Sequence, residues 1–242
     1  MHFYNKGGID FAVMASAPQR LYPSAPPLQF LAIDPRFEGS TTERYVVWMG
    51  KLNYVSFGYW ALVGEAQGTY SDFPFSDLTF PFKGSALADE GFFYKGTPAN
   101  YDRSNLGKFT GIAAGTAEYL ESRSPVERFG VTPLIGTAEL TITSATNGAL
   151  VLEFPNFYRF TGSINTSSNG WITGSFTGLQ KLGSAFPVDL PATISEFNDN
   201  NIRGQLYGAT PTNPTEAAGS WRLSHFAPTR DIHINGVFGV KK

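Results

Sequence analysis

Alternating apolar and polar residues dominate the C-terminal half of the chain. The segment GTAELTITS at 136–144 alternates alanine, leucine and isoleucine with glutamate and threonine, which is the period-two pattern of a strand with one buried face. Asn147-Gly148 and Asn169-Gly170 follow, and pairs of this kind supply the positive φ angles that tight hairpin turns require. The pattern therefore predicts a run of antiparallel strands joined by short turns.

Eight strands are expected in this half of the chain. An even number lets an up-and-down antiparallel sheet close into a barrel without a free edge, and a two-sheet sandwich is the alternative. Glycines inside the strands, such as Gly204 and Gly236, favour closure because they relieve crowding where a small barrel bends. The expected strands are 136–144, 150–154, 157–165, 171–177, 189–197, 201–208, 217–224 and 232–239.

The N-terminal half lacks this regular alternation. It contains a strongly apolar and aromatic stretch at 45–63 (YVVWMGKLNYVSFGYWALV), a further aromatic cluster at 92–101, and residues 109–120, which are typical of another strand pair. We therefore predict an all-β chain, with a small N-terminal β domain over residues 1–130 and an eight-stranded antiparallel β-barrel over residues 131–242. Long ordered loops often carry binding sites, so we expect the site in the N-terminal domain.

Composition agrees with an all-β chain and narrows the function. Aromatic residues make up 15% of the 242 residues, and 26 glycines and 16 prolines interrupt the chain, a mixture that favours short strands over helices. The net charge is −2 and basic residues form no long run, so we expect no nucleic-acid partner. No apolar stretch reaches the ~18 residues of a membrane helix, so we expect a soluble chain. We also expect a monomer.

Motifs that support catalysis are missing. The sequence contains no phosphate-binding glycine loop, no Gly-x-Ser-x-Gly and no His-Glu-x-x-His. The absence of cysteine excludes thiol catalysis and thiolate metal sites, and none of the three histidines lies within five residues of another. His225 shares the strand parity of Trp221 and should point into the barrel, whereas His233 should face outward. We expect a binding protein rather than an enzyme.

Three segments near the C-terminus carry a resemblance to a known family: Gly204-Gln-Leu-Tyr-Gly208, Ala217-Ala-Gly-Ser-Trp221 and the ending Gly236-Val-Phe-Gly-Val-Lys-Lys242. They resemble the last strands of the transferrin-binding protein B barrel, where a Gly-x-Phe/Tyr-Gly strand precedes a Gly-Gly-x-Trp/Phe strand and a Val-Phe-Gly-Ala-Lys-Arg-like ending. In the N-terminal half, Phe57-Gly-Tyr-Trp60 and Tyr94-Lys-Gly-Thr97 resemble the family's handle domain.

The resemblance implies a handle domain followed by a barrel, in a protein exported by a Gram-negative bacterium and secreted or held at the cell surface. Export in this family often uses an outer-membrane secretion protein. With one lobe and no lipid-bearing cysteine, the chain is most similar to the soluble single-lobe members, which resemble the secreted haem-binding protein hemophilin. The implied function is that of a hemophore for iron acquisition, which captures haem and passes it to an outer-membrane haem receptor.

Haem needs flat apolar walls and one or two axial ligands. Once the histidines of the barrel are set aside, His2 is the remaining imidazole and the candidate metal ligand; Met14, Met49 or a tyrosine phenolate is the substitute. The candidate haem-site residues are His2, Tyr4, Met14, Met49, Tyr54, Phe57, Tyr59, Trp60, Tyr94 and Tyr101.

Two alternatives remain open. In a haem site, Lys51, Lys95 or Arg103 would serve the propionates. The aromatic candidates for the haem site would equally suit the handle domain's own core. His2 would equally suit a frayed terminus. The competing function is a surface or secreted module that binds a host protein without a cofactor. Aromatic loops with proline, such as 73–82, suit the centre of such an interface.

Overall fold

The computed structural model describes residues 2–3, 12–13, 31–33, 44–63, 90–99, 107–123, 126–144, 146–184, 186–210 and 212–242. These residues are almost entirely strand, and no helix among them is long and apolar enough to cross a membrane. The elements are β1 (His2–Phe3), β2 (Ala12–Val13), β3 (Leu31–Ile33), β4 (Arg44–Lys51), β5 (Val55–Val63), β6 (Glu90–Gly96), β7 (Gly107–Arg123), β8 (Val126–Ile142), β9 (Asn147–Glu153), β10 (Tyr158–Thr166), β11 (Trp171–Lys181), the 3-10 turn η1 (Ile194–Glu196), β12 (Asp199–Tyr207), β13 (Glu216–Ala227) and β14 (Arg230–Lys241).

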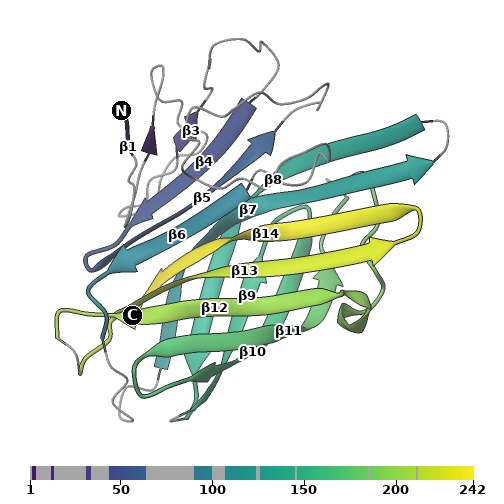
Figure 1. The fold of residues 1–242 in the computed structure, drawn as a ribbon. Coiled ribbons are helices and arrows are strands. Elements are labelled where there is room, and N and C mark those ends of the chain that lie inside the picture. The colour runs from purple at the N-terminus through teal and green to yellow at the C-terminus, as the bar shows by residue number, and fades with distance from the viewer. Residues whose placement is uncertain are drawn as a thin grey trace.

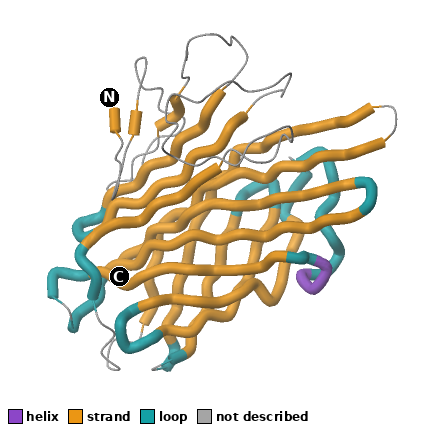
Figure 2. The backbone as a smooth tube through the Cα atoms, viewed as in Figure 1, coloured by secondary structure: helices purple, strands orange, loops and turns teal. Residues whose placement is uncertain are grey.

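Strands β7 to β14 form a closed antiparallel barrel of eight strands (Figures 1 and 2). Each strand pairs with the next one along the chain, and β14 pairs with β7 to close the sheet. A closed sheet of this kind leaves no unpaired strand edge. The predicted all-β fold with an eight-stranded barrel is therefore confirmed, and the two-sheet sandwich is wrong for this chain.

One of the eight strands is not where the sequence analysis placed it. Residues 189–197 form the connection between β11 and β12 and contain η1. Pro191 lies in this connection and has no N–H to donate to a strand ladder. The remaining strand is β7, which is one continuous strand of 17 residues where we expected a strand pair. The barrel thus begins at Gly107, before the expected boundary at residue 131, and the division into two domains stays a prediction.

The two Asn-Gly pairs lie in different places. Gly170 has a φ of 74° in the hairpin between β10 and β11, as predicted. Asn147, in contrast, is the first residue of β9, and the hairpin turn comes just before it. There the backbone N–H groups of Thr143 and Ser144 donate to the Asn147 carbonyl, at 2.9 and 3.1 Å. Backbone bonding across this wider turn replaces the tight turn that the pair predicted.

Aromatic side chains fill the barrel interior. Trp221 is 1% exposed, and the centre of its ring lies 5.5 Å from that of Phe154 and 6.5 Å from that of Phe176. Glycine at position 236 makes room for this indole, because a Cβ there would lie 2.6 Å from a Trp221 ring carbon. An eight-stranded barrel is narrow enough for side chains to fill it. The interior formed by the described residues is a packed core.

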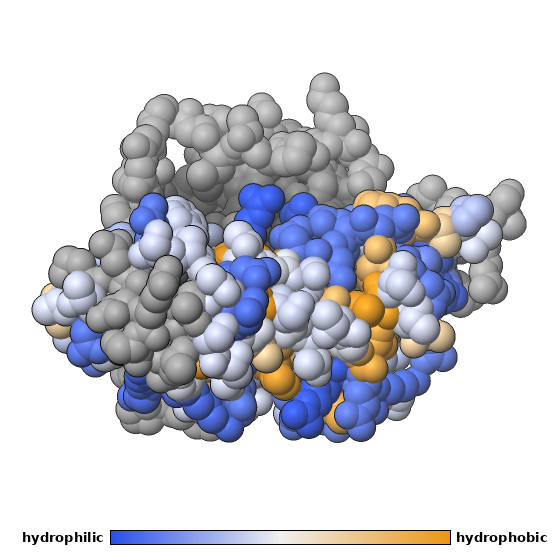
Figure 3. All heavy atoms as spheres, turned by 90° about the horizontal axis from the view of Figure 1, so that it is seen from below, coloured by the Kyte–Doolittle hydropathy of each residue, from blue (hydrophilic) through white to orange (hydrophobic). Residues whose placement is uncertain are grey.

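A four-stranded antiparallel sheet, β3–β4–β5–β6, lies against the outside of this barrel (Figure 1). Strand β5 contacts β7, β13 and β14, and β6 contacts β13 and β14. On the side of the barrel away from the sheet, the visible described surface is mostly hydrophilic, with apolar residues in narrow bands (Figure 3). The buried apolar residues between sheet and barrel, which we call the junction cluster, are Leu52, Val55, Phe57, Ala114, Tyr207, Ala218 and Val237.

Candidate functional site

Glu216, at the start of β13, anchors the turn between β4 and β5 to the barrel. Its side chain is 1% exposed, and its two carboxylate oxygens accept hydrogen bonds from the backbone N–H groups of Asn53, at 2.8 Å, and Tyr54, at 2.7 Å. Hydrogen bonds to an ionised acceptor are roughly twice as strong as neutral ones. The carboxylate therefore holds one end of the four-stranded sheet at a defined place on the barrel wall.

The segment that follows β6 is bound to the end of β12. The Ala99 N–H donates to the Leu206 carbonyl at 2.9 Å, and the Gly208 N–H donates to the Thr97 carbonyl at 3.3 Å. Pro98 forms a bridge with Tyr207 between these two bonds. Sheet and barrel are thus joined by backbone bonding as well as by the junction cluster.

Replacing Glu216 with alanine should loosen this attachment and lower the free energy of unfolding by about 1–3 kcal/mol, because two partly buried backbone N–H groups lose their acceptor. Amide hydrogen exchange of Asn53 and Tyr54 should accelerate in the variant. Glu139→Ala is the matched control, since Glu139 is a partly exposed surface carboxylate paired with Lys108. Equal effects of the two substitutions would contradict the anchoring role.

Two tyrosines, Tyr207 in the junction cluster and Tyr94 packed against it, are held as neutral phenols. Burial raises the pKa of Tyr94, although a hydrogen bond with Ser220 and the charge of Arg203 act in the opposite direction. The pKa of Tyr207 is raised as well, mainly by burial and to a smaller extent by the proximity of Tyr94. Neither hydroxyl readily becomes a phenolate near neutral pH, so the structure favours a packing and hydrogen-bonding role for both.

The same barrel wall becomes polar beyond the junction cluster. Arg222 Nε donates to Asn235 Oδ1 at 2.9 Å, and Ser224 Oγ lies 3.1 Å from His233 Nδ1. Burial lowers the pKa of His233, which favours the neutral imidazole. Outward-facing residues of a barrel are usually solvated, yet several here are at most 3% exposed: Thr116, Glu118, Ser224 and Asn235.

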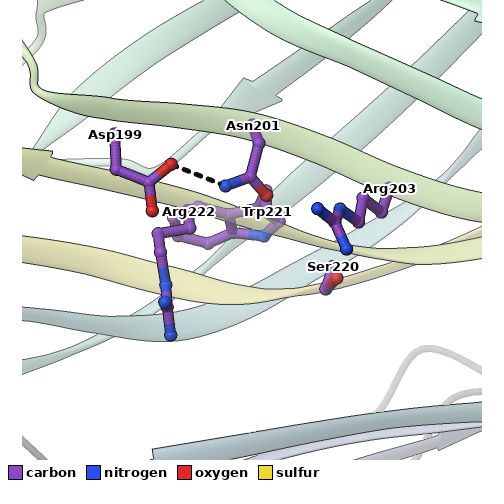
Figure 4. A pocket seen from close by; sticks show the side chains of 6 residues that line it. All are labelled: Asp199, Asn201, Arg203, Ser220, Trp221 and Arg222. Atoms are coloured by element: carbon purple, nitrogen blue, oxygen red, sulfur yellow. Dashed lines mark hydrogen bonds between the residues drawn. The ribbon is translucent and has the colours of Figure 1, made fainter.

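A pocket of about 320 Å³ opens on this polar wall between β12 and β13 (Figure 4). Its carboxylate, on Asp199, accepts a hydrogen bond from Asn201 Nδ2 at 2.8 Å. Its two guanidinium groups belong to Arg203 on β12 and Arg222 on β13. The strand register places Arg203 opposite Ser220 and Arg222 opposite Asn201, so the two arginines are two positions apart along the strand pair. The lining residues are Asp199, Asn201, Arg203, Ser220, Trp221 and Arg222.

The candidate haem-site residues with described side chains gather at the junction. Phe57 is 1% exposed and belongs to the junction cluster, and Tyr54 and Tyr94, both half-buried, pack against it. The structure thus brings these three together, between sheet and barrel. Their assignment to a haem site stays a prediction.

The other candidates are described in part or not at all. For His2 in β1, Met49 in β4, and Tyr59 and Trp60 in β5, only the strand position is described. Tyr4, Met14 and Tyr101 lie outside the described residues.

His233 lies on the outer wall, as its strand parity predicted, whereas His225 is half-buried at the end of the barrel and not in its core. His225 sits at the barrel end, where its Nδ1 is 2.8 Å from the Glu196 carbonyl oxygen and its ring is 6.2 Å from that of Phe197. His233 lies on the outer wall, with its ring 5.1 Å from that of Phe226. Within the described ranges, no three histidine or carboxylate side chains gather closely enough to hold a metal ion.

The polar pocket was not predicted from the sequence. Arg203 and Arg222 lie in expected barrel strands, at positions with outward parity, where a charged residue is typical of any solvated wall. The only signal was the concentration of charged and amide residues in neighbouring strands, and their proximity depends on the register between β12 and β13.

No family model matches this chain, and no curated protein matches its sequence. Among solved structures, the chain is similar to a transferrin-binding protein B described as the structure of intact Ap-TbpB with its N and C lobes. The alignment has a TM-score of 0.40 and 15% sequence identity, and it covers 88% of this chain and 40% of that one. The chain therefore spans less than half the length of this two-lobed protein.

Proposed function

We propose that this protein works by binding, with the barrel as a scaffold and with haem as the ligand of the N-terminal half. The observation that supports this is the filled barrel interior: Trp221, Phe154 and their neighbours occupy the space in which other eight-stranded barrels hold a small ligand. A binding site then belongs outside the barrel, and the four-stranded sheet is attached there through Glu216 and the junction cluster.

Haem as the ligand follows from the resemblance of the sequence to the soluble single-lobe members of its family. The aromatic residues of the N-terminal half supply flat apolar walls of the kind that haem requires. Because Tyr94 is held as a phenol, His2 is the first candidate for the axial ligand. In this proposal the protein acts outside a Gram-negative cell, after export through an outer-membrane secretion protein, and an outer-membrane receptor accepts the haem.

A hemin titration tests the proposal. Purified protein should develop a sharp Soret band that saturates at one hemin per chain. An absorption spectrum that stays identical to that of free hemin would sink the haem proposal.

The axial ligand is tested by a matched pair of variants. His2→Ala should shift the Soret band and weaken hemin binding by at least about tenfold, because iron loses a direct ligand. His225→Ala should leave both unchanged, because this imidazole is bonded to the Glu196 carbonyl at the barrel end. An unaltered spectrum in His2→Ala would exclude His2 as the ligand.

Protein binding without a cofactor is the second candidate function, and the exposed Trp171 favours it. This indole is 53% exposed on β11, and its register partner is Gln205 on β12, two residues from the exposed Arg203. Tryptophan and arginine are the residue types most enriched at the energetic centres of protein interfaces. If hemin does not bind, protein binding remains as the candidate function. In that case Trp171→Ala should abolish binding of the partner protein.

A further inference from the structure

Trp171 and three polar residues form one exposed patch on strands β10, β11 and β12. The strand register places Asn165 opposite Thr173 and Thr173 opposite Arg203, so these three residues form a row across the strands. Trp171 lies on the same face, because side chains two positions apart in a strand point the same way. All four residues are exposed, whereas Ile172, between Trp171 and Thr173, is buried in the barrel core. We call this set of four residues the Trp171 patch.

The polar side chains of the Trp171 patch are free to bind a ligand. Among the described residues, no group forms a hydrogen bond with the side chain of Asn165, Thr173 or Arg203. Arg203 also forms no ion pair with any of them. Figure 4 shows its side chain beside Ser220, apart from the Asp199 carboxylate at the other end of the pocket between β12 and β13. The patch therefore offers a hydroxyl, an amide and a guanidinium group whose charge is not neutralised.

The turn that precedes Trp171 is held in place by hydrogen bonds. Gln205 lies opposite Trp171 in the register and is 5% exposed, and its Nε2 donates to the Asn169 carbonyl at 2.8 Å. Ser167 Oγ accepts a hydrogen bond from the Trp171 backbone N–H at 3.1 Å. Arg203 is the diagonal neighbour of Trp171, and diagonal neighbours lie about 7–8 Å apart, within reach of aromatic and long side chains. One small ligand can therefore contact both the indole and the guanidinium group.

A flat indole bordered by polar side chains suits a sugar ring. The C–H groups on the face of a pyranose carry a partial positive charge and pack on the negative face of an aromatic ring. The hydroxyl groups at the edge of the sugar need donors and acceptors, which Asn165 and Thr173 supply. The energetic centre of a protein interface, in contrast, is usually enclosed by contacts that exclude water. Here the exposed residues that continue this face along β10 are small and polar, Ser163 and Thr161.

We propose that the Trp171 patch binds a carbohydrate that carries a carboxylate, with the sugar ring on the indole and the carboxylate on Arg203. A guanidinium group presents two parallel N–H donors that match the two oxygens of a carboxylate. The inference is independent of haem binding. It rests on the second candidate function, because it names an acidic glycan as the part of a partner glycoprotein that Trp171 contacts.

Methyl β-D-glucuronide is a suitable probe, and methyl β-D-glucoside is its neutral counterpart, with a hydroxymethyl group in place of the carboxylate. Titration of the full chain without hemin, followed by NMR, should show one-to-one binding of the glucuronide in the millimolar range. Shifts should be concentrated at the indole N–H of Trp171 and at the amides of Asn165, Thr173 and Arg203. The glucoside should bind at least about tenfold more weakly, because it lacks the charge that Arg203 recognises. Added salt should weaken binding of the glucuronide alone.

Two variants separate the two contacts. Trp171→Ala should weaken glucuronide binding by at least about tenfold, whereas Phe226→Ala, which removes a 51% exposed aromatic ring from β13, should change it by less than about twofold. Arg203→Gln should reduce the affinity for the glucuronide to that for the glucoside, because only the charged contact is lost. Arg159→Gln is its matched control, since Arg159 is an exposed arginine on β10 that pairs with Glu153. All four substituted residues are exposed, so the melting temperatures should stay close to that of the parent.

The inference is overturned if the glucuronide does not bind, if the glucoside binds equally well, or if the shifts lie elsewhere. It is also overturned if acetyl-Gly-Glu-Gly-amide, a peptide with one carboxylate, binds more tightly than the glucuronide, a result that would assign the patch to a polypeptide. A negative sugar titration overturns this inference alone, because the second candidate function is tested separately by the loss of partner binding in Trp171→Ala.

Discussion

Gly239→Ala should push the four-stranded sheet away from the barrel. Gly239 lies on β14, and a Cβ built there would overlap the ring of Phe57, which is 1% exposed in the junction cluster. Overpacking of this kind typically costs 1–3 kcal/mol, which for a chain of this size lowers the melting temperature by roughly 2–12 °C. Amide hydrogen exchange along β5 should accelerate more than exchange in the barrel strands away from the contact.

Gly178→Ala is the matched control, because a Cβ at Gly178 would have nothing within 4 Å. Its effect should stay within about 0.5 kcal/mol, as at an ordinary surface position. Combining Gly239→Ala with Phe57→Leu should cost less than the sum of the two single changes, because the smaller side chain makes room for the new methyl group. Indistinguishable melting temperatures for Gly239→Ala and Gly178→Ala would show that Phe57 does not rest on this glycine.

Trp221→Ala should be the most destabilising single change in the barrel. The indole is 1% exposed and packs against Phe154 and Phe176, so its removal leaves a large cavity in the core. Truncations of this kind cost about 3–5 kcal/mol. Denaturant unfolding measures the loss directly.

Trp171→Ala provides the comparison within the same residue type. Trp171 is 53% exposed, so its truncation should cost no more than about 0.5 kcal/mol. Trp221→Phe keeps part of the volume and should lie between the two, which preserves the test even if Trp221→Ala does not fold. A Trp221→Ala protein as stable as Trp171→Ala would mean that the barrel interior is not the packed core described above.

The barrel was predictable because its signal is local. Alternation in a strand reports two environments, core and exterior, and the burial pattern of β10 keeps this alternation from Tyr158 to Thr166. The positive φ of Gly170 in the turn between β10 and β11 follows from local turn chemistry, and the inward-facing apolar side chains that fill the barrel follow from the same alternation. Strand β7 was misjudged because Gly111 and Gly115 interrupt its apolar pattern. In the folded barrel both glycines lie close against the β14 backbone, at contacts between residues more than a hundred positions apart.

The candidate site was far less predictable. The aromatic residues of the sequence pointed to the N-terminal half, and Phe57 and Tyr94 do lie in the described sheet, but nothing in their spacing placed them against Gly239 and Ser220 of the barrel. Glu216 read as an ordinary strand residue, although its carboxylate holds the turn at Asn53 through a contact 163 positions away.

By itself, the sequence determined that this chain is all-β and that it forms an eight-stranded antiparallel barrel from mainly C-terminal strands, because strand periodicity and turn chemistry act over a few residues. Only the tertiary structure decided that β7 closes the barrel, that the sheet rests on its outer wall, and that Arg203 and Arg222 share one pocket. These arrangements depend on strand register and on contacts between distant segments, which no local pattern of apolar and polar residues encodes.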